Sequence, residues 1–447
     1  NFRSFVLQDV LRRCLEVSGV AVRHVRNLTD VDDKTIRQSQ AEGKSLRDFT
    51  AYWTDKFHRD TRSLNLLDPA VEPSAVAHIP QQIELIKKLL DKKHAYVGGD
   101  GSVYFRVSSF PDYGKLSRLK ERQITTGSSA RGGEVVDTDE YSRDHAADFA
   151  LWKAYKPEDG PNAWESPWGR GRPGWHIECS AKSLEYLGEG LDLHSGGEDL
   201  IFPHHENEIA QAEAATGQTF CRHWFHVAHL MVDGRKMSKS LGNLYTLEDV
   251  VGRGFTPMEL RYVLLSGHYR QPLNFTWDSL VAARSALGKL ARFLDHLAEA
   301  AQVDAAQFKN MLDETPRGEE AFGPFGFVWA SLANDLNTPE ALGHLFNAVK
   351  VLEARIRGEA SVPPEQVKAD LAAFLKILFA LGLEWSALGA PETQGEVPEE
   401  IRQLAEERWK ARQAKDWQKA DALRNRLKIL GWAVKDAQDS YELIKTV

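Results

Sequence analysis

The sequence predicts an α/β fold in the first half of the chain and a helical fold in the second half. Helix-like and strand-like hydrophobic patterns alternate over residues 1–95, as they do in βαβ units with a parallel sheet. From about residue 246 onward, long stretches with helical periodicity follow N-terminal capping signals, which is typical of a helical bundle. The length of 447 residues allows about three domains.

The N-terminal α/β part is expected to begin with a helix. Apolar residues form one stripe along residues 2–17, and this stripe comprises Phe2, Val6, Val10 and Cys14. Ser18-Gly19 ends the helix, and residues 20–25 predict a short strand that enters the polar turn at residues 26–30. A second amphipathic helix is expected at residues 78–90.

The next part of the chain, residues 96–165, is rich in turn residues. Gly-Gly-Asp-Gly (98–101), Ser-Ser-Phe-Pro (108–111) and Arg-Gly-Gly (131–133) separate short strand-like segments. We therefore expect an inserted, partly β subdomain here. Residues 166–245 return to an α/β pattern and hold most of the unusual residues.

Two capping signals open helices in the second half of the chain. Thr256-Pro257-Met258-Glu259 combines a capping box with proline at the first helical position, and Asn337-Thr338-Pro339-Glu340 repeats this signal. Residues 385–400 mix glycine, proline and acidic residues, which predicts a linker. Residues 401–447 are then expected to form a small separate module.

The composition excludes several classes of protein. Hydrophobic residues make up 42% and charged residues 27%, which excludes a largely disordered or fibrous chain. The sequence has no run of 18 apolar residues, and its first ten residues do not resemble a signal peptide. Three cysteines exclude a disulfide scaffold and fit a reducing, cytoplasmic setting. With a net charge of −8, binding of a nucleic acid requires local basic patches.

A first group of candidate ligands surrounds Pro203-His-His-Glu-Asn-Glu208, which is expected to open a helix. His204 and Glu208 are four residues apart and share a helix face, and Cys179 lies 25 residues upstream of His204. Cysteine, histidine and glutamate together predict a zinc site with an open position. On spacing alone, a surface pair of His204 and Glu208 with a core Cys179 is favoured, because such pairs are common.

A second candidate is the segment Lys236-Met-Ser-Lys-Ser-Leu-Gly-Asn243. Lys236 and Lys239 lie in a loop rich in glycine and serine, where their ammonium groups can stabilise negative charge on a transferring phosphate. Gly234 and Gly242 flank the two lysines and would let the loop move onto a nucleotide. The alternative is a generic basic loop.

A third candidate is Leu193-His-Ser-Gly-Gly-Glu-Asp199. Gly196 and Gly197 would let the backbone approach a ligand such as ATP closely, and Asp199 could bind a ribose hydroxyl. Taken alone, this segment predicts an ordinary glycine turn.

The C-terminal module carries a local excess of positive charge. Residues 402–428 hold nine lysine or arginine residues and four acidic residues. Trp409, Trp417 and Trp432 lie in or beside this stretch and could stack on unpaired bases. The alternative is a solvated helix face whose tryptophans turn into the core, and for Trp417 this alternative is at least as strong.

Together these motifs resemble the cysteinyl-tRNA synthetase family of class I aminoacyl-tRNA synthetases. The resemblance covers nearly the whole chain and rests on six segments in the order and spacing of that family: RNLTDVDDK (26–34), FPDYGKLS (110–117), DFALWKAYKP (148–157), GRPGWHIECS (171–180), FPHHENEIAQ (202–211) and KMSKSLGN (236–243). The combination is specific enough to reverse the preference at Cys179, His204 and Glu208 in favour of zinc binding.

The resemblance implies a Rossmann-like class I nucleotide-binding domain, with an inserted connective subdomain, a helical bundle and an anticodon-binding module. The corresponding ranges are 1–95 and 166–245 for the catalytic domain, 96–165 for the insertion, 246–385 for the stem-contact and helical bundle domain, and 401–447 for the module. It also implies activation of L-cysteine with ATP and Mg²⁺ and transfer of cysteine to tRNA(Cys), with Zn²⁺ bound to the substrate thiolate.

The resemblance also assigns roles to residues. It implies zinc binding by Cys179, His204 and Glu208, together with a further cysteine. It implies contacts to the substrate for Thr29, Trp175 and His194, whose alternatives are a turn threonine capping residues 30–33, a core tryptophan and a structural histidine. It places more weight on Lys239 than on Lys236, and it matches residues 414–432 to the tRNA-contacting C-terminus. We expect no membrane partner, and for the oligomeric state a monomer is favoured.

One departure from the family concerns the N-terminus. The family's HIGH-type signature lies directly before a segment similar to NFRSFVLQDVLRR, so Asn1 resembles the last position of a HIGN variant. The catalytic histidine and the first zinc-binding cysteine would precede Asn1. We therefore interpret the sequence as a truncated form of a longer enzyme, and Cys14 and Cys221 are not expected to replace the missing ligand.

Two other functions remain open from the sequence. One is a ligase that joins cysteine to an amino sugar in mycothiol synthesis, a family that shares the zinc and KMSKS patterns but lacks a tRNA-binding C-terminus; the basic module after residue 400 argues against it. The other is a non-catalytic paralogue that binds tRNA or zinc.

Overall fold

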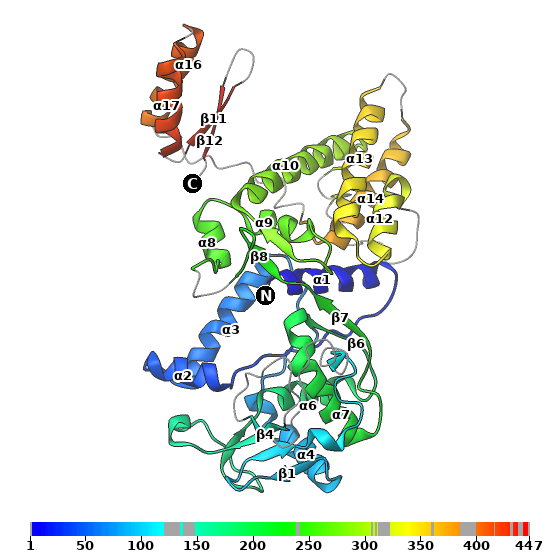
Figure 1. Ribbon diagram of the computed structural model, residues 1–447. Coiled ribbons are helices and arrows are strands. Elements are labelled where there is room, and N and C mark those ends of the chain that lie inside the picture. Colours follow the sequence, from blue (N-terminus) through cyan, green and yellow to red (C-terminus); the bar gives the residue numbers. More distant parts are fainter. Residues whose placement is uncertain are drawn as a thin grey trace.

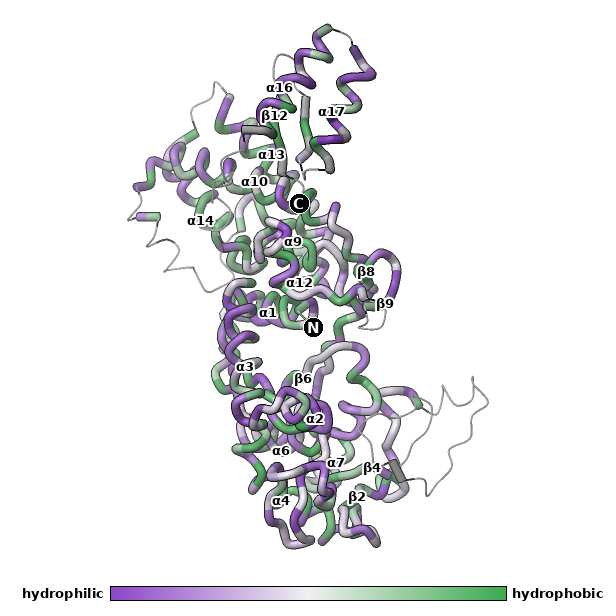
Figure 2. Tube along the Cα trace, turned by 90° about the vertical axis from the view of Figure 1, so that its left-hand side faces the viewer, coloured by the Kyte–Doolittle hydropathy of each residue, from purple (hydrophilic) through white to green (hydrophobic). Residues whose placement is uncertain are grey.

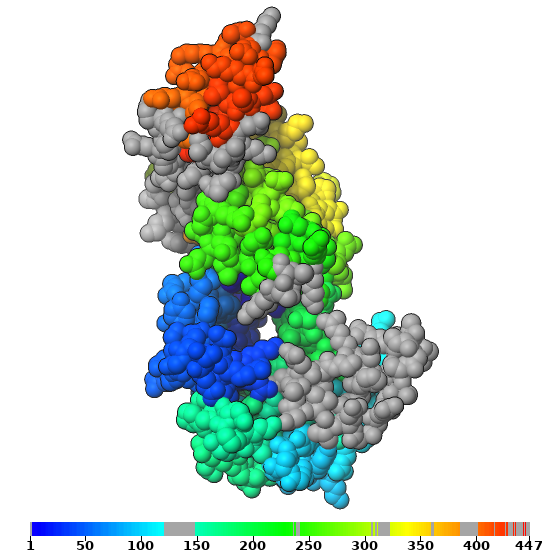
Figure 3. All heavy atoms as spheres, turned by 60° about the vertical axis from the view of Figure 1, so that its left-hand side comes forward, coloured from blue at the N-terminus to red at the C-terminus, as the bar shows by residue number. Residues whose placement is uncertain are grey.

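The protein forms an elongated molecule in which the N-terminal helix lies near the middle (Figure 1). The computed structural model describes residues 2–119, 135–136, 148–237, 242–304, 307–308, 311, 322–358, 362–384, 399–414, 416–429, 432–436 and 441–445. A lobe built on sheets lies on one side of the N-terminal helix, and the helical region lies on the other. The surface is hollowed in the middle, between the blue segment that follows this helix and the green segments (Figure 3).

Helix α1 (Phe2–Val17) confirms the first predicted element. Val6, Val10 and Cys14 are buried, and α1 belongs to the same apolar core as helices of the second half of the chain, so Cys14 is a core residue as expected. Three more helices follow: α2 (Asp33–Ala41), α3 (Leu46–Ser63) and α4 (Ile79–Asp91). Helix α4 confirms the helix predicted at residues 78–90.

The strand predicted at residues 20–25 was wrong. In its place the structure has two isolated parallel bridges, Val25 to Val71 and Leu28 to Ser74. The partner segment contains Pro69 and Pro73, which have no amide hydrogen, so a continuous ladder of hydrogen bonds cannot form along it. The first residues of the predicted strand are therefore left exposed, as at Val20.

The lobe built on sheets, at the bottom of Figure 1 and called the lower lobe below, contains a five-stranded, mainly antiparallel sheet. Its strands are β1 (Ala95–Val97), β2 (Val103–Phe105), β3 (Val135–Val136), β4 (Asp148–Ala154) and β5 (Gly171–Pro173), in the order β1-β2-β4-β3 with β5 also paired to β4. Only the pairing of β3 with β4 is parallel. The glycine-rich segment 98–101 forms the turn between β1 and β2, where Gly98 N–H donates to the Ser102 carbonyl. Residues 131–133 lie outside the described residues.

Helices α4, α6 (Trp175–Leu187) and α7 (Glu206–Thr216) pack with this sheet around one apolar core. Helix α6 begins directly after Gly174, and a Cβ atom at Gly174 would lie 2.1 Å from the carbonyl oxygen of Ala150 in β4. This position therefore requires glycine, because any side chain would push α6 away from the sheet.

Parallel pairing occurs later in the chain than predicted. Strands β6 (Leu191–Gly197) and β7 (Cys221–Val227) are parallel, and α7 forms the crossover between them. Strand β8 (Leu230–Val232) pairs in parallel with β10 (Leu273–Phe275) and antiparallel with β9 (Arg235–Lys236). Over residues 1–95, in contrast, the described parallel contacts are limited to the two bridges named above.

The second half of the chain is helical, as predicted. Its helices are α8 (Leu247–Gly252), α9 (Pro257–Leu265), α10 (Trp277–Ala300), α12 (Gly326–Ala333), α13 (Thr338–Arg357) and α14 (Pro364–Leu381). The capping box of α9 is present, because Thr256 Oγ1 accepts from Glu259 N–H and Glu259 accepts from Thr256 N–H. Helix α13 is capped by Asn337, whose side chain accepts from Glu340 N–H.

A small unit follows at the C-terminus. It comprises α16 (Glu399–Gln413), α17 (Trp417–Ile429) and the antiparallel strands β11 (Trp432–Asp436) and β12 (Tyr441–Lys445), which share a core of their own. Hydrophilic residues predominate along α16 and α17 (Figure 2). Residues 385–398 of the predicted linker lie outside the described residues. The domain boundaries given above stay predictions.

Short 3₁₀ turns occur at Val76–His78, Val107–Ser109, Pro157–Asp159, Glu198–Leu200 and Gly323–Phe325. None of the helices in the described part of the chain combines the length and the apolar character that a bilayer crossing requires.

Candidate metal and substrate site

The structure brings Cys179, His204 and Glu208 together in the lower lobe. Their ligand atoms all lie within 4.8 Å of one another, although Cys179 is on α6, His204 is in the turn Ile201–His205 and Glu208 is on α7. All three are buried, with exposed fractions of 8%, 5% and 0%. The site is therefore a closed cluster of one sulfur, one imidazole and one carboxylate.

The turn before α7 places His204 beside Glu208. Phe202 has an extended backbone, and α7 begins at Glu206, so His204 lies in the turn that leads into the helix. His204 Nε2 is 3.0 Å from Glu208 Oε1. His204 Nδ1 is 2.8 Å from His176 Nδ1, which fixes the ring and leaves Nε2 facing the cluster.

The Glu208 carboxylate has the character of a metal ligand. Both of its oxygens are buried, and each faces one imidazole: His204 Nε2 is 3.0 Å from Oε1, and His194 Nε2 is 3.3 Å from Oε2. A buried carboxylate is costly unless neighbouring donors or a cation offset its charge. Burial acts to raise the pKa of Glu208, but His194 and His204 hold this pKa well below its usual range.

The Cys179 thiol completes the donor set. Burial, together with the carboxylates Glu208 and Glu178, raises the pKa of this thiol well above its usual range. Without a cation the sulfur stays protonated, whereas a bound metal ion requires and stabilises the thiolate. Sulfur, imidazole and carboxylate donors form a set that zinc accepts, so these residues fit the metal that the sequence resemblance implies.

Further histidines surround the cluster, and sequence reasoning missed two of them, His205 and His226. His194, His205 and Glu208 form a second group whose ligand atoms lie within 4.8 Å of one another. His205 Nδ1 is 2.8 Å from His226 Nε2. The sequence offers one signal for His205, which is its position next to His204, but His226 is recognisable only through the pairing of β6 with β7.

The three residues predicted to contact the substrate all lie at this cluster. The Trp175 ring lies 4.5 Å from the His204 ring, measured between centroids. His194 Nε2 is 3.3 Å from Glu208 Oε2. Thr29 Oγ1 donates to Glu178 Oε1 at 2.8 Å, and Glu178 is the neighbour of Cys179 in α6.

The alternative reading of Thr29 as a helix cap was wrong. Asp32 is the N-cap of α2 and forms a capping box with Thr35. Thr29 is therefore free of that role, and its side chain turns toward α6. Trp175 and His194 are half-buried, so neither is a fully enclosed core residue.

Gly196 and Gly197 end strand β6 and do not form a turn, which corrects the alternative considered from the sequence. A Cβ atom would lie 2.8 Å from the His205 ring at Gly196 and 2.3 Å from Asp199 Oδ1 at Gly197. Gly196 is therefore required for close packing against the His205 ring, whereas the contact at Gly197 is with the end of a side chain that can move. Both glycines lie at the carboxyl end of a parallel strand, where α/β proteins bind ligands. Asp199 lies in the turn that follows.

The two predicted lysines are described only in part. Lys236 ends β9, nothing is described of its side chain, and Lys239 lies outside the described residues. The hairpin that precedes them is anchored, because the Asn274 side chain accepts from Gly234 N–H at 2.7 Å.

The tryptophans of the C-terminal unit differ in exposure. Trp417 is 59% exposed, so the alternative in which it turns into the core is wrong. Trp432 is buried in the small core, and Trp409 is half-buried with its ring 5.7 Å from that of Tyr441. Of the three, Trp417 has the exposure that stacking on a base requires.

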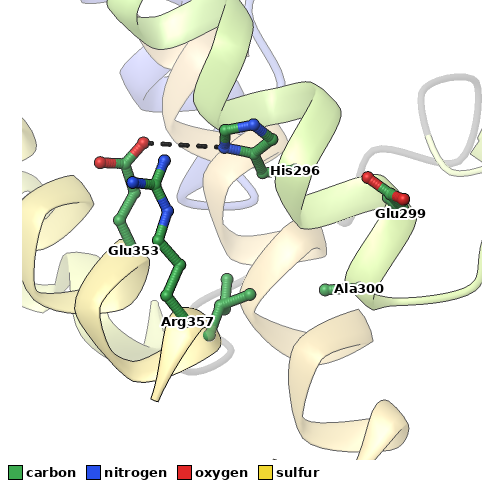
Figure 4. A pocket seen from close by; sticks show the side chains of 6 residues that line it. His296, Glu299, Ala300, Glu353 and Arg357 are labelled. Carbon is green, nitrogen blue, oxygen red and sulfur yellow. Dashed lines mark ion pairs between the residues drawn. The ribbon is translucent and has the colours of Figure 1, made fainter.

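Two cavities accompany these features. One, of about 670 Å³, adjoins the candidate site, since Trp175 lines it together with Asp33, Arg37 and Arg172. The other, of about 390 Å³, lies between α10 and α13 and is lined by His296, Glu299, Ala300, Glu353, Ile356 and Arg357 (Figure 4). His296 Nδ1 and Glu353 Oε1 are 3.9 Å apart there, and no predicted site residue lines this cavity.

Three families match successive parts of the chain. Residues 1–285 match tRNA synthetases class I (C) catalytic domain, residues 328–383 match the DALR domain, and residues 394–441 match the cysteinyl-tRNA ligase anticodon binding domain. Among solved structures, similar folds include a Mycobacterium tuberculosis methionyl-tRNA synthetase in complex with methionyl-adenylate (TM-score 0.56, 16% identity, 85% of this chain and 86% of the other). An Agrobacterium radiobacter K84 LeuRS from a ternary complex has a TM-score of 0.57 at 13% identity (88% and 83%).

Relatives with assigned functions match over the full chain. The cysteine–tRNA ligase of Opitutus terrae is 53% identical over 446 residues, which cover 99% of this chain and 90% of the relative. That of Chlamydia caviae is 44% identical over 450 residues, which cover 100% and 90%. With a class I catalytic domain over residues 1–285 and such relatives over its whole length, the chain belongs to the cysteine–tRNA ligase family of the class I aminoacyl-tRNA synthetases.

Proposed function

We propose that this protein activates L-cysteine with ATP and transfers it to the 3′ end of tRNA(Cys), with zinc held by Cys179, His204 and Glu208 at the substrate thiol. The observation that carries this proposal is the convergence of these three side chains, which come from three elements and whose ligand atoms lie within 4.8 Å of one another in a buried cluster. The resemblance of the sequence motifs and the names of the relatives support the same reaction.

The protein must distinguish cysteine from serine, which has nearly the same shape. A pocket rejects such an analogue poorly by shape alone. When bound, zinc supplies a Lewis acid that prefers a thiolate to a hydroxyl. Cys179, His204 and Glu208 would hold the ion, Trp175 would form a wall beside His204, and His194 would orient the second oxygen of Glu208.

In the first proposed step the carboxylate of cysteine attacks the α-phosphate of ATP, and pyrophosphate leaves. Lys236 and Lys239 offset the negative charge that develops on the phosphate oxygens, and Mg²⁺ accompanies the nucleotide. In this proposal Gly196 and Gly197 let the backbone at the end of β6 approach the nucleotide closely, and Asp199 binds the ribose. In the second step the terminal ribose hydroxyl of the tRNA attacks the adenylate carbonyl, and AMP leaves. Both steps depend chiefly on positioning.

The C-terminal unit favours tRNA over an amino sugar as the acceptor. It combines the excess of basic residues at 402–428 with the exposed Trp417, and its match is to an anticodon-binding domain. This argues against the ligase of mycothiol synthesis. The three unpaired cysteines support a cytoplasmic location.

The proposal is tested by cysteine-dependent exchange between ATP and pyrophosphate, with zinc content measured on the same samples. The chain of 447 residues is compared with a form that carries any upstream residues encoded by its gene. We expect one zinc ion per active chain and exchange with cysteine but not with serine.

Glu208→Gln is expected to lower both zinc content and exchange at least about 10-fold, because it removes the anionic ligand. Glu353→Gln, in the distant cavity between α10 and α13, serves as the matched control. If neither form of the protein showed exchange in the presence of zinc, the enzymatic proposal would be rejected in favour of a binding paralogue.

A further inference from the structure

We propose that Glu178 and Lys182 are positioning residues that hold the Thr29 hydroxyl as a hydrogen-bond acceptor for the α-ammonium group of the substrate amino acid. This inference rests on the proposed function and extends it from the thiol end of the substrate to the amino end.

The two residues form a buried ion pair on α6. Glu178 and Lys182 are one helical turn apart, with exposed fractions of 1% and 2%, and Lys182 Nζ is 3.3 Å from Glu178 Oε2. Lys182 Nζ also donates to the carbonyl oxygen of Leu28 at 3.2 Å. Thr29 Oγ1 donates to the other oxygen of Glu178 at 2.8 Å. The ion pair therefore contacts both the backbone before Thr29 and the Thr29 side chain.

The existing hydrogen bonds of the Thr29 hydroxyl determine whether it can donate to a ligand or accept from one. A threonine hydroxyl has one hydrogen and two acceptor lone pairs. The hydrogen is directed to Glu178, and one lone pair accepts from Asn27 Nδ2 at 3.0 Å. The remaining lone pair can only accept. Because Thr29 is half-buried, a ligand can reach it, and the ligand group that it selects is a donor such as ammonium rather than a carboxylate.

Stability alone does not account for this ion pair. The free energy needed to remove two charges from water often exceeds the attraction between them. A protein with apolar residues of similar size in their place is commonly as stable. The position of the pair instead ties it to the site, because the same helix carries Trp175 one turn before Glu178 and Cys179 directly after it. One helix thus carries a proposed zinc ligand for the thiol end and the residues that orient Thr29 for the amino end.

Two cysteine analogues separate this role from a general structural one. Cysteamine keeps the thiol and the ammonium group but has no carboxylate, whereas 3-mercaptopropionate keeps the thiol and the carboxylate but has no ammonium group. In Glu178→Gln the amide oxygen would face the Lys182 ammonium group, so the amide nitrogen would donate to Thr29 and the hydroxyl hydrogen would turn toward the substrate. We expect inhibition of exchange by cysteamine to weaken about 10-fold or more, as for a lost hydrogen bond to a charged group, with inhibition by 3-mercaptopropionate unchanged.

The same variant should raise KM for cysteine with little change in kcat, and its zinc content should remain that of the wild type. Thr29→Val should reproduce the effect, Thr29→Ser should not, and the double variant Glu178→Gln with Thr29→Val should lose no more than either single variant. Glu259→Gln is the matched control, because Glu259 is a buried glutamate of α9 that pairs with Arg284 of α10, and this change should affect both analogues equally.

Equal weakening of both analogues in Glu178→Gln, or no weakening of cysteamine, would overturn the proposal. If Glu178→Gln does not fold, other variants test the proposal through inhibition by the same two analogues. Thr29→Val is then compared with Thr29→Ser, and Lys182→Met is compared with the wild type. Failure of the wild-type protein to activate cysteine would instead refute the proposed function itself, so the two failures are distinguishable.

Discussion

At the scale of single residues, the candidate site depends on one carboxylate. Glu208 is fully buried between His194 and His204, and it belongs to both groups of potential metal ligands in the described residues. Burial alone would raise the pKa of this carboxyl group, and the two histidines hold it well below its usual range. The proposed metal site therefore stands or falls with this one side chain.

A histidine outside the site gives a prediction about acid stability. Burial, together with Arg12 and Arg26, lowers the pKa of His24 to about 4, and its Nδ1 is buried without a hydrogen bond, whereas an unfolded histidine titrates near 6.5. Between these values the unfolded chain binds a proton that the folded chain does not, so the free energy of unfolding falls as the pH falls from 6.5 to 4.

We expect His24→Gln to make this fall shallower by up to about 1.4 kcal/mol per pH unit, and to leave the pH dependence above pH 7 unchanged because the histidine is then neutral in both states. Urea unfolding at a series of pH values measures the slope. His296→Gln, whose side chain is 45% exposed in the native protein, is the control. An unchanged slope in His24→Gln would contradict the prediction.

At the scale of elements, helix α6 is the part of the fold on which the site depends most. It carries Trp175, Glu178 and Cys179, and it packs on β4 through Gly174. Buried Ser180 donates to Gln211 of α7 at 2.6 Å, which joins α6 to the helix that carries Glu208. The relative placement of the proposed zinc ligands is therefore set by how two helices pack on one sheet.

Gly174→Ala tests this dependence. The added methyl group would overlap the Ala150 carbonyl oxygen, so α6 must shift, and we expect a loss of at least about 2 kcal/mol in stability together with lower zinc content. Gly343→Ala is the matched control, because Gly343 lies within α13 with no atom near the added methyl group, and it should stabilise the protein by about 0.5–1 kcal/mol. Thermal unfolding and metal analysis of both variants give the answer, and equal effects would be inconsistent with the packing argument.

At the scale of the whole molecule, α1 connects the two main parts. The Arg3 guanidinium donates to four carbonyl oxygens, those of Ala228, His229, His268 and Gln271. Farther along α1, Asp9 pairs with the fully buried Arg261 of α9 at 2.6 Å. These contacts hold the segment that leads into β8 and β9 against the helical region.

The C-terminal unit gives a prediction at this scale. Trp417 is exposed and lies among basic residues, so Trp417→Ala should lower aminoacylation of tRNA about 10-fold through loss of stacking, while exchange of ATP with pyrophosphate stays unchanged. Phe327→Ala, which removes an exposed aromatic side chain from α12, is the control and should affect neither assay. A parallel loss of both activities in Trp417→Ala would count against a role in tRNA binding.

Local physics explains what could be predicted from the sequence. The stripe of α1, the capping box at Thr256 and the sharing of one face by His204 and Glu208 depend only on residues within one or two helical turns. The motifs extended this to the family and to the grouping of Cys179 with His204 and Glu208, because their order and spacing are specific.

Contacts between distant segments account for the rest. The strand expected at residues 20–25 was absent because its partner contains two prolines, which no pattern within residues 20–25 reveals. The bond from Thr29 to Glu178 spans 149 residues, and the contact of His205 with His226 requires the pairing of β6 with β7. Contacts between distant segments also determine exposure. Trp417 and Trp432 lie in or beside one basic stretch of sequence, but the packing of α16, α17 and β11 buries Trp432 and leaves Trp417 in solvent.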